Sequence, residues 1–404
     1  MRDSLRWLRH WTNWPAMMRT ALALLALAAS AHAQAAVVGT VFEDTNGNGV
    51  RDPGERGVPN VVVSNQDDVG KTDASGSFHL TRGPTGIVFV SVPDGFRIVG
   101  SFWHPADARN TDFALKPERA PASFTFIHAS DAHISAASVA RTRRFRAMAD
   151  SVNPAFVIIT GDLVRDALRV GEAEATSYYD LFAQEVAAFR NAVWTVPGNH
   201  ENFGIERTQS KVETSHPLYG RGMYRHYRGP DYYSFTYGGV HFVGLNSVDI
   251  DDQWYYGHVD SVQMSWLKRD LAAIPAAMPV VTFNHIPFYT AVESINGYVD
   301  APPAPSVITV NGKAQFRHSV SNAREILTLI GMNRYAIALG GHMHVREQLR
   351  YAGIPLRFYQ TAAVVGPGGS GVLPFPSGIT VYRVKNGVVD DGTFLPIDPI
   401  APRK

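Results

Sequence analysis

The sequence predicts an α/β fold that follows a small all-β domain, and two observations lead to this prediction. From Ser123 onward, short apolar runs with the character of buried strands alternate with helical stretches, as in a largely parallel sheet. From Val37 to Lys116, strand-like runs are instead separated by turn residues at short intervals, as in a β-sandwich. With 404 residues, of which 45% are hydrophobic and 18% charged, the chain is long enough for two domains with large cores.

The first 33 residues have the pattern of an export signal. An apolar stretch, Ala21–Ala29, precedes Ala31-His32-Ala33, which fits a small-x-small cleavage site. The stretch is shorter than the roughly 20 residues of a membrane-spanning helix, so we expect no transmembrane helix in the mature chain. We interpret residues 1–33 as a signal peptide, which predicts a periplasmic or secreted bacterial protein. A start at Met17 or Met18 would give a more compact signal, and a buried N-terminal helix is the alternative.

The composition limits the partners and the metal ligands of this protein. The formal net charge is +1, so we expect no basic surface of the kind that binds nucleic acid or anionic lipid. The chain has no cysteine, which excludes disulfides and thiolate ligands.

The predicted β-sandwich domain spans residues 37–116, and residues 117–122 form a linker to an α/β domain at residues 123–400. The strands that we expect in the first domain are Val38–Phe42, Val61–Val63, Gly76–Leu80 and Ile87–Val92.

A twelve-residue segment of this domain matches the calcium loop of EF-hands at every ligand position. The positions 1, 3, 5, 7, 9 and 12 are occupied by Asp44, Asn46, Asn48, Val50, Asp52 and Glu55. Ca²⁺ takes 6–8 oxygen ligands, and Gly49 stands where the loop must turn sharply around the ion. The flanking residues are strand-like, so we expect a calcium-stabilised β-domain; a hairpin turn without an ion is the alternative.

In the α/β domain, five apolar runs are each followed by a polar cluster that offers oxygen or imidazole ligands. The runs are Phe124–His128, Phe156–Thr160, Val193–Val196, Val280–Phe283 and Tyr335–Leu339. The clusters are Asp131-Ala132-His133, Gly161-Asp162, Gly198-Asn199-His200-Glu201, Asn284-His285 and Gly340-Gly341-His342-Met343-His344. Because the strands of a largely parallel sheet would deliver these clusters to one edge, the sequence predicts a binuclear metal centre there.

The remaining elements complete the α/β pattern. The expected helices are Ser138–Ser151, Ala175–Arg190, Ser261–Ile274 and Asn322–Gly331. A hairpin is expected from Tyr232–Thr236 and Val240–Leu245. The late strands, which we expect to be antiparallel, are Arg346–Tyr351, Pro355–Gln360, Ile379–Val384 and a last one from Val388 onward.

In this order, the motifs DAH, GD, GNHE, NH and GGHMH resemble the signature of the calcineurin-like metallophosphoesterase superfamily, over residues 123–365. The resemblance implies a four-layer αββα sandwich of two stacked sheets. It assigns Asp131, His133 and His344 to a first metal, Asn199, His285 and His342 to a second, and Asp162 to a bridge between them. The segment Gly39–Val63 resembles repeat-type β-domains of bacterial surface proteins and the N-terminal domains of some bacterial members of the superfamily.

The resemblance also assigns a catalytic residue and bears on the metals. His200 would stabilise the transition state or protonate the leaving oxygen, with Glu201 or Asp166 as candidates to orient it. The ligand types suit Fe, Mn or Zn. Purple acid phosphatases have a ligating Tyr three residues after the bridging Asp, where this chain has Arg165, which argues against that class. Arg165 is expected either to contact the substrate phosphate or to be a solvated loop charge.

The predicted function is that of an exported, metal-dependent phosphoesterase, which hydrolyses phosphate esters by attack of a metal-bridging hydroxide. Monoesters, diesters and anhydrides remain open as substrates. One alternative is a surface-binding protein whose β-domain carries the function on a metal-fold scaffold, and another is metal-dependent hydrolysis of non-phosphate bonds. Aromatic residues near the motifs, Phe203, Trp254, Tyr255, Tyr256 and Tyr289, are favoured as packing residues. The other histidines are expected to pack or face solvent, with His216 and His258 as first candidates for the pocket rim.

Overall fold

The structure of the chain, a computed structural model, describes residues 36–299, 305–331, 334–353, 355–368 and 374–398. Val37–Lys404 group into one unit, which is described below. The predicted signal peptide at residues 1–33 lies outside the described residues. Within the described part of the chain, no helix combines the length and the apolar character that a bilayer span requires.

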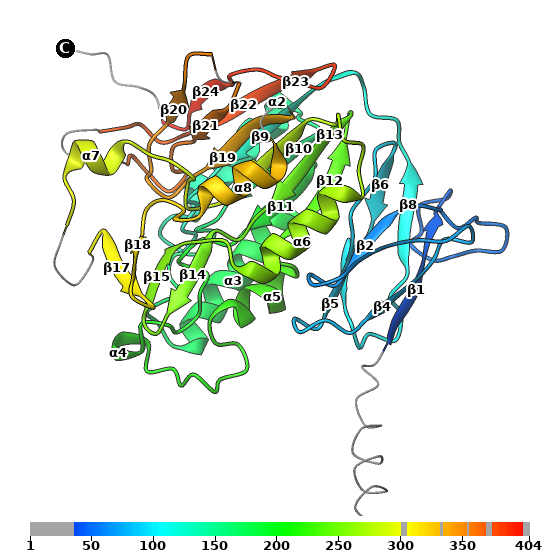
Figure 1. The fold of residues 1–404 in the computed structure, drawn as a ribbon, viewed down its shortest axis with the longest axis horizontal. Helices are drawn as coiled ribbons and strands as arrows, with labels where there is room; N and C mark the ends of the chain where they lie inside the picture. The colour runs from blue at the N-terminus through cyan, green and yellow to red at the C-terminus, as the bar shows by residue number, and fades with distance from the viewer. Residues whose placement is uncertain (1–35, 300–304, 332–333, 354, 369–373, 399–404) are drawn as a thin grey trace, which may run out of the picture. The chain divides into compact units, whose positions relative to one another are not determined.

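Residues 36–117 form two four-stranded sheets, so the prediction of an all-β region is confirmed (Figure 1). The first sheet, in the order β4-β1-β8-β6, contains Ala36–Glu43 (β1), Ser77–Thr81 (β4), Phe96–Val99 (β6) and Phe113–Pro117 (β8). The second, in the order β3-β2-β5-β7, contains Val62–Ser64 (β2), Val69–Lys71 (β3), Ile87–Val90 (β5) and Trp103–Pro105 (β7). The sequence predicts β1, β2, β4 and β5. It does not predict β3, β6 and β7, which are short and partly exposed, nor the largely buried β8.

The α/β part contains two six-stranded sheets. The first, in the order β11-β10-β9-β22-β23 with β24 beside β22, contains Ser123–Ala129 (β9), Phe156–Thr160 (β10), Ala192–Val196 (β11), Gly378–Lys385 (β22), Val388–Val389 (β23) and Thr393–Pro396 (β24). The second, in the order β12-β13-β16-β19-β21-β20, contains Tyr233–Tyr237 (β12), Val240–Gly244 (β13), Val280–Phe283 (β16), Tyr335–Gly340 (β19), Glu347–Arg350 (β20) and Arg357–Gln360 (β21). The five strands that carry the polar clusters are β9, β10, β11, β16 and β19, as predicted.

Strand directions agree with the sequence prediction except at one strand. The pairs β9–β10 and β10–β11 are parallel, as are β13–β16 and β16–β19. Strands β20, β22, β23 and β24 each pair antiparallel with a neighbour, as expected for the late strands. Strand β21 pairs antiparallel with β20, as expected, but it also pairs parallel with β19, because it lies between β20 and the parallel block.

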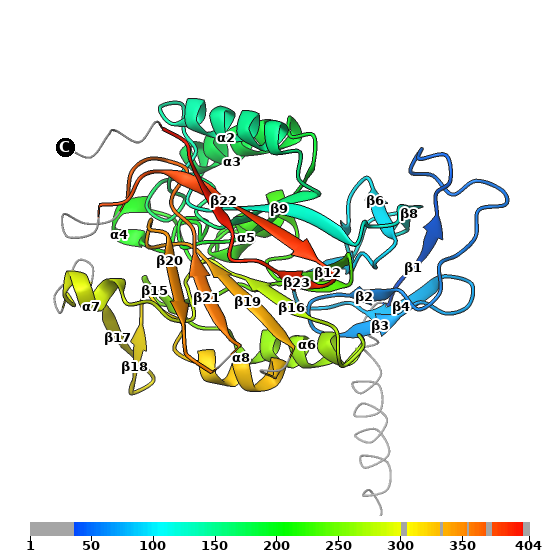
Figure 2. The same cartoon turned by 90° about the horizontal axis from the view of Figure 1, so that it is seen from above.

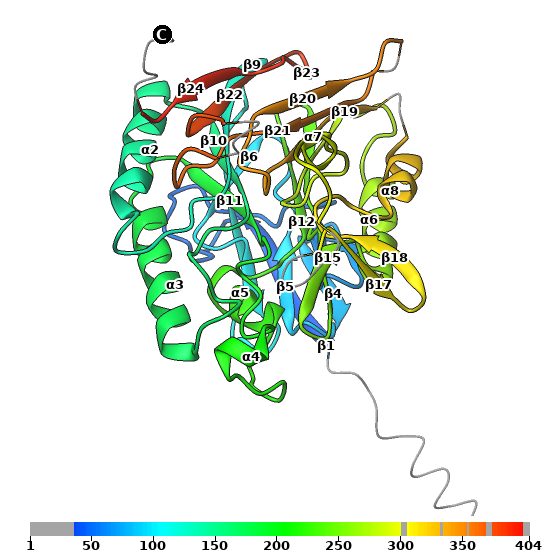
Figure 3. The same cartoon turned by 90° about the vertical axis from the view of Figure 1, so that its left-hand side faces the viewer.

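The helices confirm the α/β sandwich. Predicted helices are found close to their expected bounds, as Val139–Val152 (α2), Glu172–Ala187 (α3), Ser261–Ala272 (α6) and Ala323–Ile330 (α8). Unpredicted elements are Arg207–Ser210 (α4), Arg221–Arg228 (α5), Val292–Asn296 (α7) and the hairpins Val248–Asp251/Trp254–Gly257 (β14/β15) and Val307–Val310/Lys313–Phe316 (β17/β18). Figures 2 and 3 show α2 and α3 on one outer side, α6 and α8 on the other, and the two sheets between them.

Alternating side chains of the strands explain these layers. Ile127 and Val157 pack in the cluster that contains helix residues Phe145 and Phe182. Their strand neighbours, Phe126 and Phe156, belong instead to the cluster shared with the second sheet, and the Phe126 and Phe156 rings stack 5.5 Å apart. Because successive strand residues point to opposite faces, one apolar run can bury both sides of a central strand.

The presence of two sheets corrects the expectation, drawn from the strand pattern alone, that one sheet edge carries every ligand. Strands β9, β10 and β11 belong to the first sheet, and β16 and β19 to the second. The carboxyl ends of both parallel blocks deliver their loops to the same place, where the metal-ligand motifs meet.

Candidate metal centre

Five of the seven predicted metal ligands have backbone φ angles in the left-handed region. They are Asp131 (55°), His133 (39°), Asp162 (47°), His342 (73°) and His344 (56°). Such a residue costs roughly 1–3 kcal/mol and persists only where the surrounding structure imposes it, often at functional sites. These turns follow β9, β10 and β19, so the chain leaves each strand sharply and aims its polar side chains into one space.

Glu201 holds two of these turns together. Its buried carboxylate accepts backbone N–H groups of Asp162 (2.8 Å), Leu163 (2.8 Å), Val164 (3.0 Å) and Gly198 (2.6 Å). Burial and the neighbouring Asp162 carboxylate raise the pKa of Glu201 to about 8, against the effect of the N–H donors. A Cβ atom at Gly198 would lie 2.2 Å from Asp162 Oδ1, so only glycine allows this approach. Glu201 therefore positions the loops after β10 and β11, and the idea that it orients His200 is wrong.

The ligands predicted for the first metal lie together. His344 Nε2 is 3.1 Å from Asp131 Oδ1 and 3.3 Å from His133 Nε2. Asp131 is fully buried, and no well-directed hydrogen bond reaches its Oδ1 within the described residues. Burial lowers the pKa of His133 to about 4, which keeps its imidazole neutral. The Asp131 carboxylate, against the effect of burial, raises the pKa of His344, and these three side chains form a candidate metal-binding group.

The ligands predicted for the second metal also lie together. His285 Nε2 is 3.1 Å from Asn199 Oδ1 and 3.1 Å from His342 Nδ1. The other ring nitrogen of His285, Nδ1, is 2.8 Å from the Thr160 carbonyl oxygen. Because a carbonyl only accepts, Nδ1 carries the proton there, and in neutral His285 the Nε2 lone pair faces the site.

Asp162 lies between the two groups. Its Oδ2 is 3.5 Å from His133 Nε2, 3.3 Å from His285 Nε2 and 3.9 Å from His200 Nε2. Burial alone would lower the pKa of His285, but the Asp162 carboxylate outweighs it and raises that pKa to about 9. This is the position that a bridging ligand needs.

The donor set fits a pair of transition metals. Imidazole nitrogens face each other at 3.3 Å (His133 and His344) and at 3.1 Å (His285 and His342). Two lone pairs at these distances repel unless a proton or a cation lies between them. Nitrogen and carboxylate donors in such a cluster suit Fe, Mn or Zn, and all seven predicted ligands take part.

His200 lies beside this cluster and is oriented by a backbone group. Its Nδ1 is 2.8 Å from the Arg165 carbonyl oxygen, so this nitrogen donates and Nε2 faces Asp162. Asp166 Oδ1 is 3.8 Å from Nδ1 and accepts the backbone N–H groups of residues 168 and 169. The carbonyl of Arg165 is thus the closer orienting group, and a backbone atom leaves no signal in a sequence.

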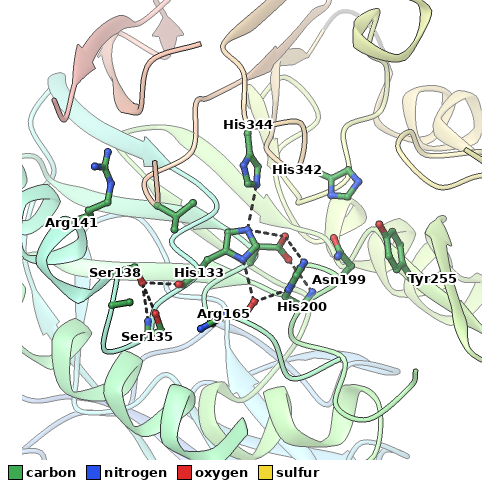
Figure 4. A pocket seen from close by; sticks show the side chains of 13 residues that line it. His133, Ser135, Ser138, Arg141, Arg165, Asn199, His200, Tyr255, His342 and His344 are labelled. Carbon is green, nitrogen blue, oxygen red and sulfur yellow. Dashed lines mark hydrogen bonds and ion pairs between the residues drawn. The ribbon is translucent and has the colours of Figure 1, made fainter. Parts of the chain in front are cut away.

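Five of the seven predicted ligands line a pocket of about 670 Å³, namely His133, Asp162, Asn199, His342 and His344 (Figure 4). Besides the ligands, it is lined by Ser135, Ala137, Ser138, Arg141, Arg165, His200, Tyr255 and Val365. Arg165 is exposed, and no carboxylate pairs with its guanidinium among the described residues. The sequence favours Tyr255 as a packing residue, yet its ring forms part of the pocket wall, edge-on to His342.

The two histidines expected at the pocket rim do not line the pocket, and a different histidine contacts a predicted ligand. His216 pairs with Glu172 at 3.2 Å and His258 with Asp249 at 3.0 Å, and neither lines the pocket. His318, for which the sequence predicts packing or solvent exposure, lies instead with its Nδ1 2.7 Å from His342 Nε2. It follows β18 and has no ligand-like spacing from other motif residues, so the sequence gives no sign of this contact.

The calcium-type loop at residues 44–55 is held by its own hydrogen bonds. The buried Asp44 carboxylate accepts three backbone N–H groups of the loop. Asp52 Oδ2 accepts the side-chain amides of Asn46 and Asn48, both at 2.8 Å. Glu55 accepts the backbone N–H groups of residues 45 and 52. The predicted ligands gather, and calcium binding by Asp44, Asn46, Asn48, Val50, Asp52 and Glu55 stays a prediction.

Comparison of this chain with known proteins identifies its family. A model of the calcineurin-like phosphoesterase family matches residues 124–346, more than half of the chain. The chain is similar to a solved dimetal phosphatase from Danio rerio, with 15% identity over 65% of this chain and 93% of that chain and a TM-score of 0.43. It is also similar to a putative 5'-nucleotidase from Staphylococcus aureus, with 14% identity over 70% of this chain and 56% of that chain and a TM-score of 0.40. No curated protein matches the chain in sequence.

Proposed function

Because the chain belongs to the calcineurin-like phosphoesterase family, it is a hydrolase that acts on phosphoester bonds, and we propose that it works with two transition metals in the pocket. One observation carries this proposal. Ligand atoms from five strand-end loops converge on both sides of the Asp162 carboxylate, in groups whose members lie within 4.8 Å of one another.

The residues would divide between two metals as the family resemblance implies. Asp131, His133 and His344 would hold the first ion, Asn199, His285 and His342 the second, and Asp162 both. When bound, Fe, Mn or Zn ions would activate water and neutralise charge on the phosphate oxygens. The hydrogen bond from His285 Nδ1 to the Thr160 carbonyl and the neutral state of His133 would help to orient these two ligands.

His200 and Arg165 would handle the substrate. With its Nδ1–H donated to the Arg165 carbonyl, His200 turns Nε2 toward the pocket, where a proton on Nε2 would pass to the leaving alcohol oxygen. The Arg165 side chain is exposed beside the same space, so its guanidinium can donate to phosphate oxygens.

We further propose that the protein is exported and that the loop at residues 44–55 binds Ca²⁺. The apolar stretch and cleavage site within residues 1–33 support export, and N-terminal sequencing of the periplasmic fraction of a bacterial host should find a chain that begins after Ala33. Six oxygen ligands at the spacing of an EF-hand support calcium binding, which titration calorimetry with Ca²⁺ would measure.

A pair of chromogenic substrates tests the activity. Purified protein is given Mn²⁺ or Zn²⁺ and then either p-nitrophenyl phosphate or bis-p-nitrophenyl phosphate. We expect metal-dependent release of p-nitrophenol from at least one of them, and the preferred substrate distinguishes a monoesterase from a diesterase. If neither is cleaved with any metal, the proposal fails, and a surface-binding role for the β-domain gains support.

A further inference from the structure

His342, a predicted ligand of the second metal, contacts a histidine that lies outside the five motifs. His318 Nδ1 lies 2.7 Å from His342 Nε2, and the two rings stack with centroids 4.9 Å apart and planes at 23°. The other ring neighbours of His342, His285 and Tyr255, meet it edge-on at 71° and 89°. The stacked partner is therefore also the one that forms a short hydrogen bond.

The two nitrogens of His342 have different roles in this arrangement. Its Nδ1 faces His285 Nε2 at 3.1 Å, inside the predicted metal group. A nitrogen that binds a metal must present a lone pair, so neutral His342 carries its proton on Nε2. That proton is donated to His318 Nδ1, which must then be an acceptor.

The same reasoning fixes the tautomer of His318. With Nδ1 accepting, the neutral ring has its proton on Nε2, which lies 3.8 Å from Glu293 Oε1. Glu293 is buried on α7, and its carboxylate is a nearby acceptor. Glu293, His318 and His342 thus make successive polar contacts that lead to the second predicted metal group.

The segment that carries His318 is held firmly against the pocket wall. The buried Arg317 side chain donates to the carbonyl oxygens of Tyr255 (3.3 Å) and Pro305 (3.1 Å), and its guanidinium lies 4.2 Å from the Tyr255 ring centroid. A Cβ atom at Gly257 would lie 2.1 Å from the Ser319 carbonyl oxygen, so glycine permits this close packing. The position of His318 is consequently fixed by the packing of its neighbours.

We propose that His318 is a positioning residue for the second metal: it accepts the Nε2 proton of His342 and so fixes the Nδ1 lone pair of His342 toward the ion, with Glu293 behind it. This inference rests on the proposed function, because it requires that His342 binds a metal. Hydrogen bonds of this kind to a ligating histidine typically change metal affinity about 10- to 100-fold.

The test compares His318→Phe with His318→Asn. Phenylalanine keeps a ring that stacks on His342 but cannot accept a proton, whereas the asparagine carbonyl can accept one. Metal binding is measured with Mn²⁺ by competition against a chelator and by electron paramagnetic resonance, in which two ions that share a carboxylate give an exchange-coupled signal. His258→Phe is the matched control, because His258 pairs with Asp249 outside the pocket.

For His318→Phe we expect roughly 10- to 100-fold weaker binding of one of the two ions and a mononuclear signal, with partial recovery in His318→Asn. The control should bind both ions like the wild type. Two tightly bound ions with a coupled signal in His318→Phe would overturn the inference. A wild type that never binds two ions would instead contradict the proposed function itself.

A measurement on the wild type keeps the inference testable if the phenylalanine variant does not fold. In the Zn²⁺-loaded protein, ¹⁵N NMR of labelled histidine reports which ring nitrogen carries the proton. We expect His318 with its proton on Nε2 and an unprotonated Nδ1. The opposite tautomer would overturn the proposed role of His318.

Discussion

The two candidate cation sites of this chain differ in what their ligand atoms face. In the loop at residues 44–55, side-chain donors meet acceptors, as when Asn46 and Asn48 both donate to Asp52. In the pocket, like atoms meet, as when the imidazole nitrogens of His285 and His342 face each other at 3.1 Å. The loop can therefore keep its shape with its own hydrogen bonds, whereas the pocket brings together nitrogens that need a proton or a metal ion between them.

This difference separates a site that is local in sequence from one that is built by the fold. The loop places its six ligands within twelve residues, so its hydrogen bonds form wherever the turn forms. The pocket draws on loops that follow β9, β10, β11, β16 and β19 in two sheets, and strained turns aim its ligands inward. We expect changes in the pocket to affect turnover and changes in the loop to affect stability.

The largest effect should come from Asp162→Asn. This change removes a negative charge that lies within 4 Å of nitrogens from all three of His133, His200 and His285. We expect turnover to fall to background and metal to be lost on dialysis, as measured by elemental analysis. Glu55→Gln, in the calcium-type loop, is the control and should leave both quantities unchanged. Full turnover in Asp162→Asn would remove the distinction between the two sites.

A smaller loss is expected for His200→Ala, which separates metal binding from proton transfer within the pocket. His200 lies at the edge of the ligand cluster, and its Nδ1 is engaged by the Arg165 carbonyl. Loss of a general acid typically costs about 10²- to 10⁴-fold in kcat. We expect this loss with both metals retained; a variant that turns over like the wild type would contradict the assigned role.

The pH dependence of metal binding should differ between the two sites. The metal affinity of the pocket should rise by about tenfold per pH unit, whereas the Ca²⁺ affinity of the loop should not change. Metal binding requires neutral His285, whose pKa Asp162 raises from 6.5 to about 9, so affinity should increase as the pH rises toward 9. The metal-free fold should behave oppositely: protonated His285 stabilises it fully below pH 6.5, and this contribution is lost as the pH rises through about 9. Chelator competition between pH 6.5 and 9 measures the first trend, and a flat pocket affinity would contradict it. The loop has no imidazole, so its Ca²⁺ affinity should stay level over this range.

The smallest effect is expected from Glu55→Gln in the loop. At a Ca²⁺ concentration about 100-fold above Kd, binding stabilises a fold by about 2.7 kcal/mol. We expect Ca²⁺ to raise the Tm of the wild type by several degrees and to raise that of Glu55→Gln much less, without a change in turnover. Thermal unfolding with and without Ca²⁺ measures this, and equal shifts would mean that Glu55 is not a ligand.

The sequence predicts the metal ligands better than the residues that position them, for a physical reason. Motifs at the ends of apolar runs indicate where ligands leave the sheets, so Asp131, Asp162 and His285 can be proposed as ligands from their place in the sequence. Nothing in the sequence indicates that His318, which follows a hairpin, packs on His342, because only the folded chain brings them together. The division of the ligand strands between two sheets likewise depends on tertiary packing and is implied only by the family resemblance.

Backbone groups form the other part that sequence reasoning misses. The Arg165 carbonyl orients His200, and four N–H groups hold Glu201, yet almost every residue has such groups. From the sequence alone, the side chains of Glu201 and Arg165 are expected to act in the pocket. Arg165 lines the pocket, whereas the Glu201 side chain holds backbone groups instead.

Anomalous X-ray scattering from crystals grown with Mn²⁺ or Zn²⁺ tests the central claim most directly. The account predicts two strong peaks: one within bonding distance of Asp131, His133 and His344, the other of Asn199, His285 and His342, with Asp162 touching both. A single peak in the pocket, or none, would contradict it.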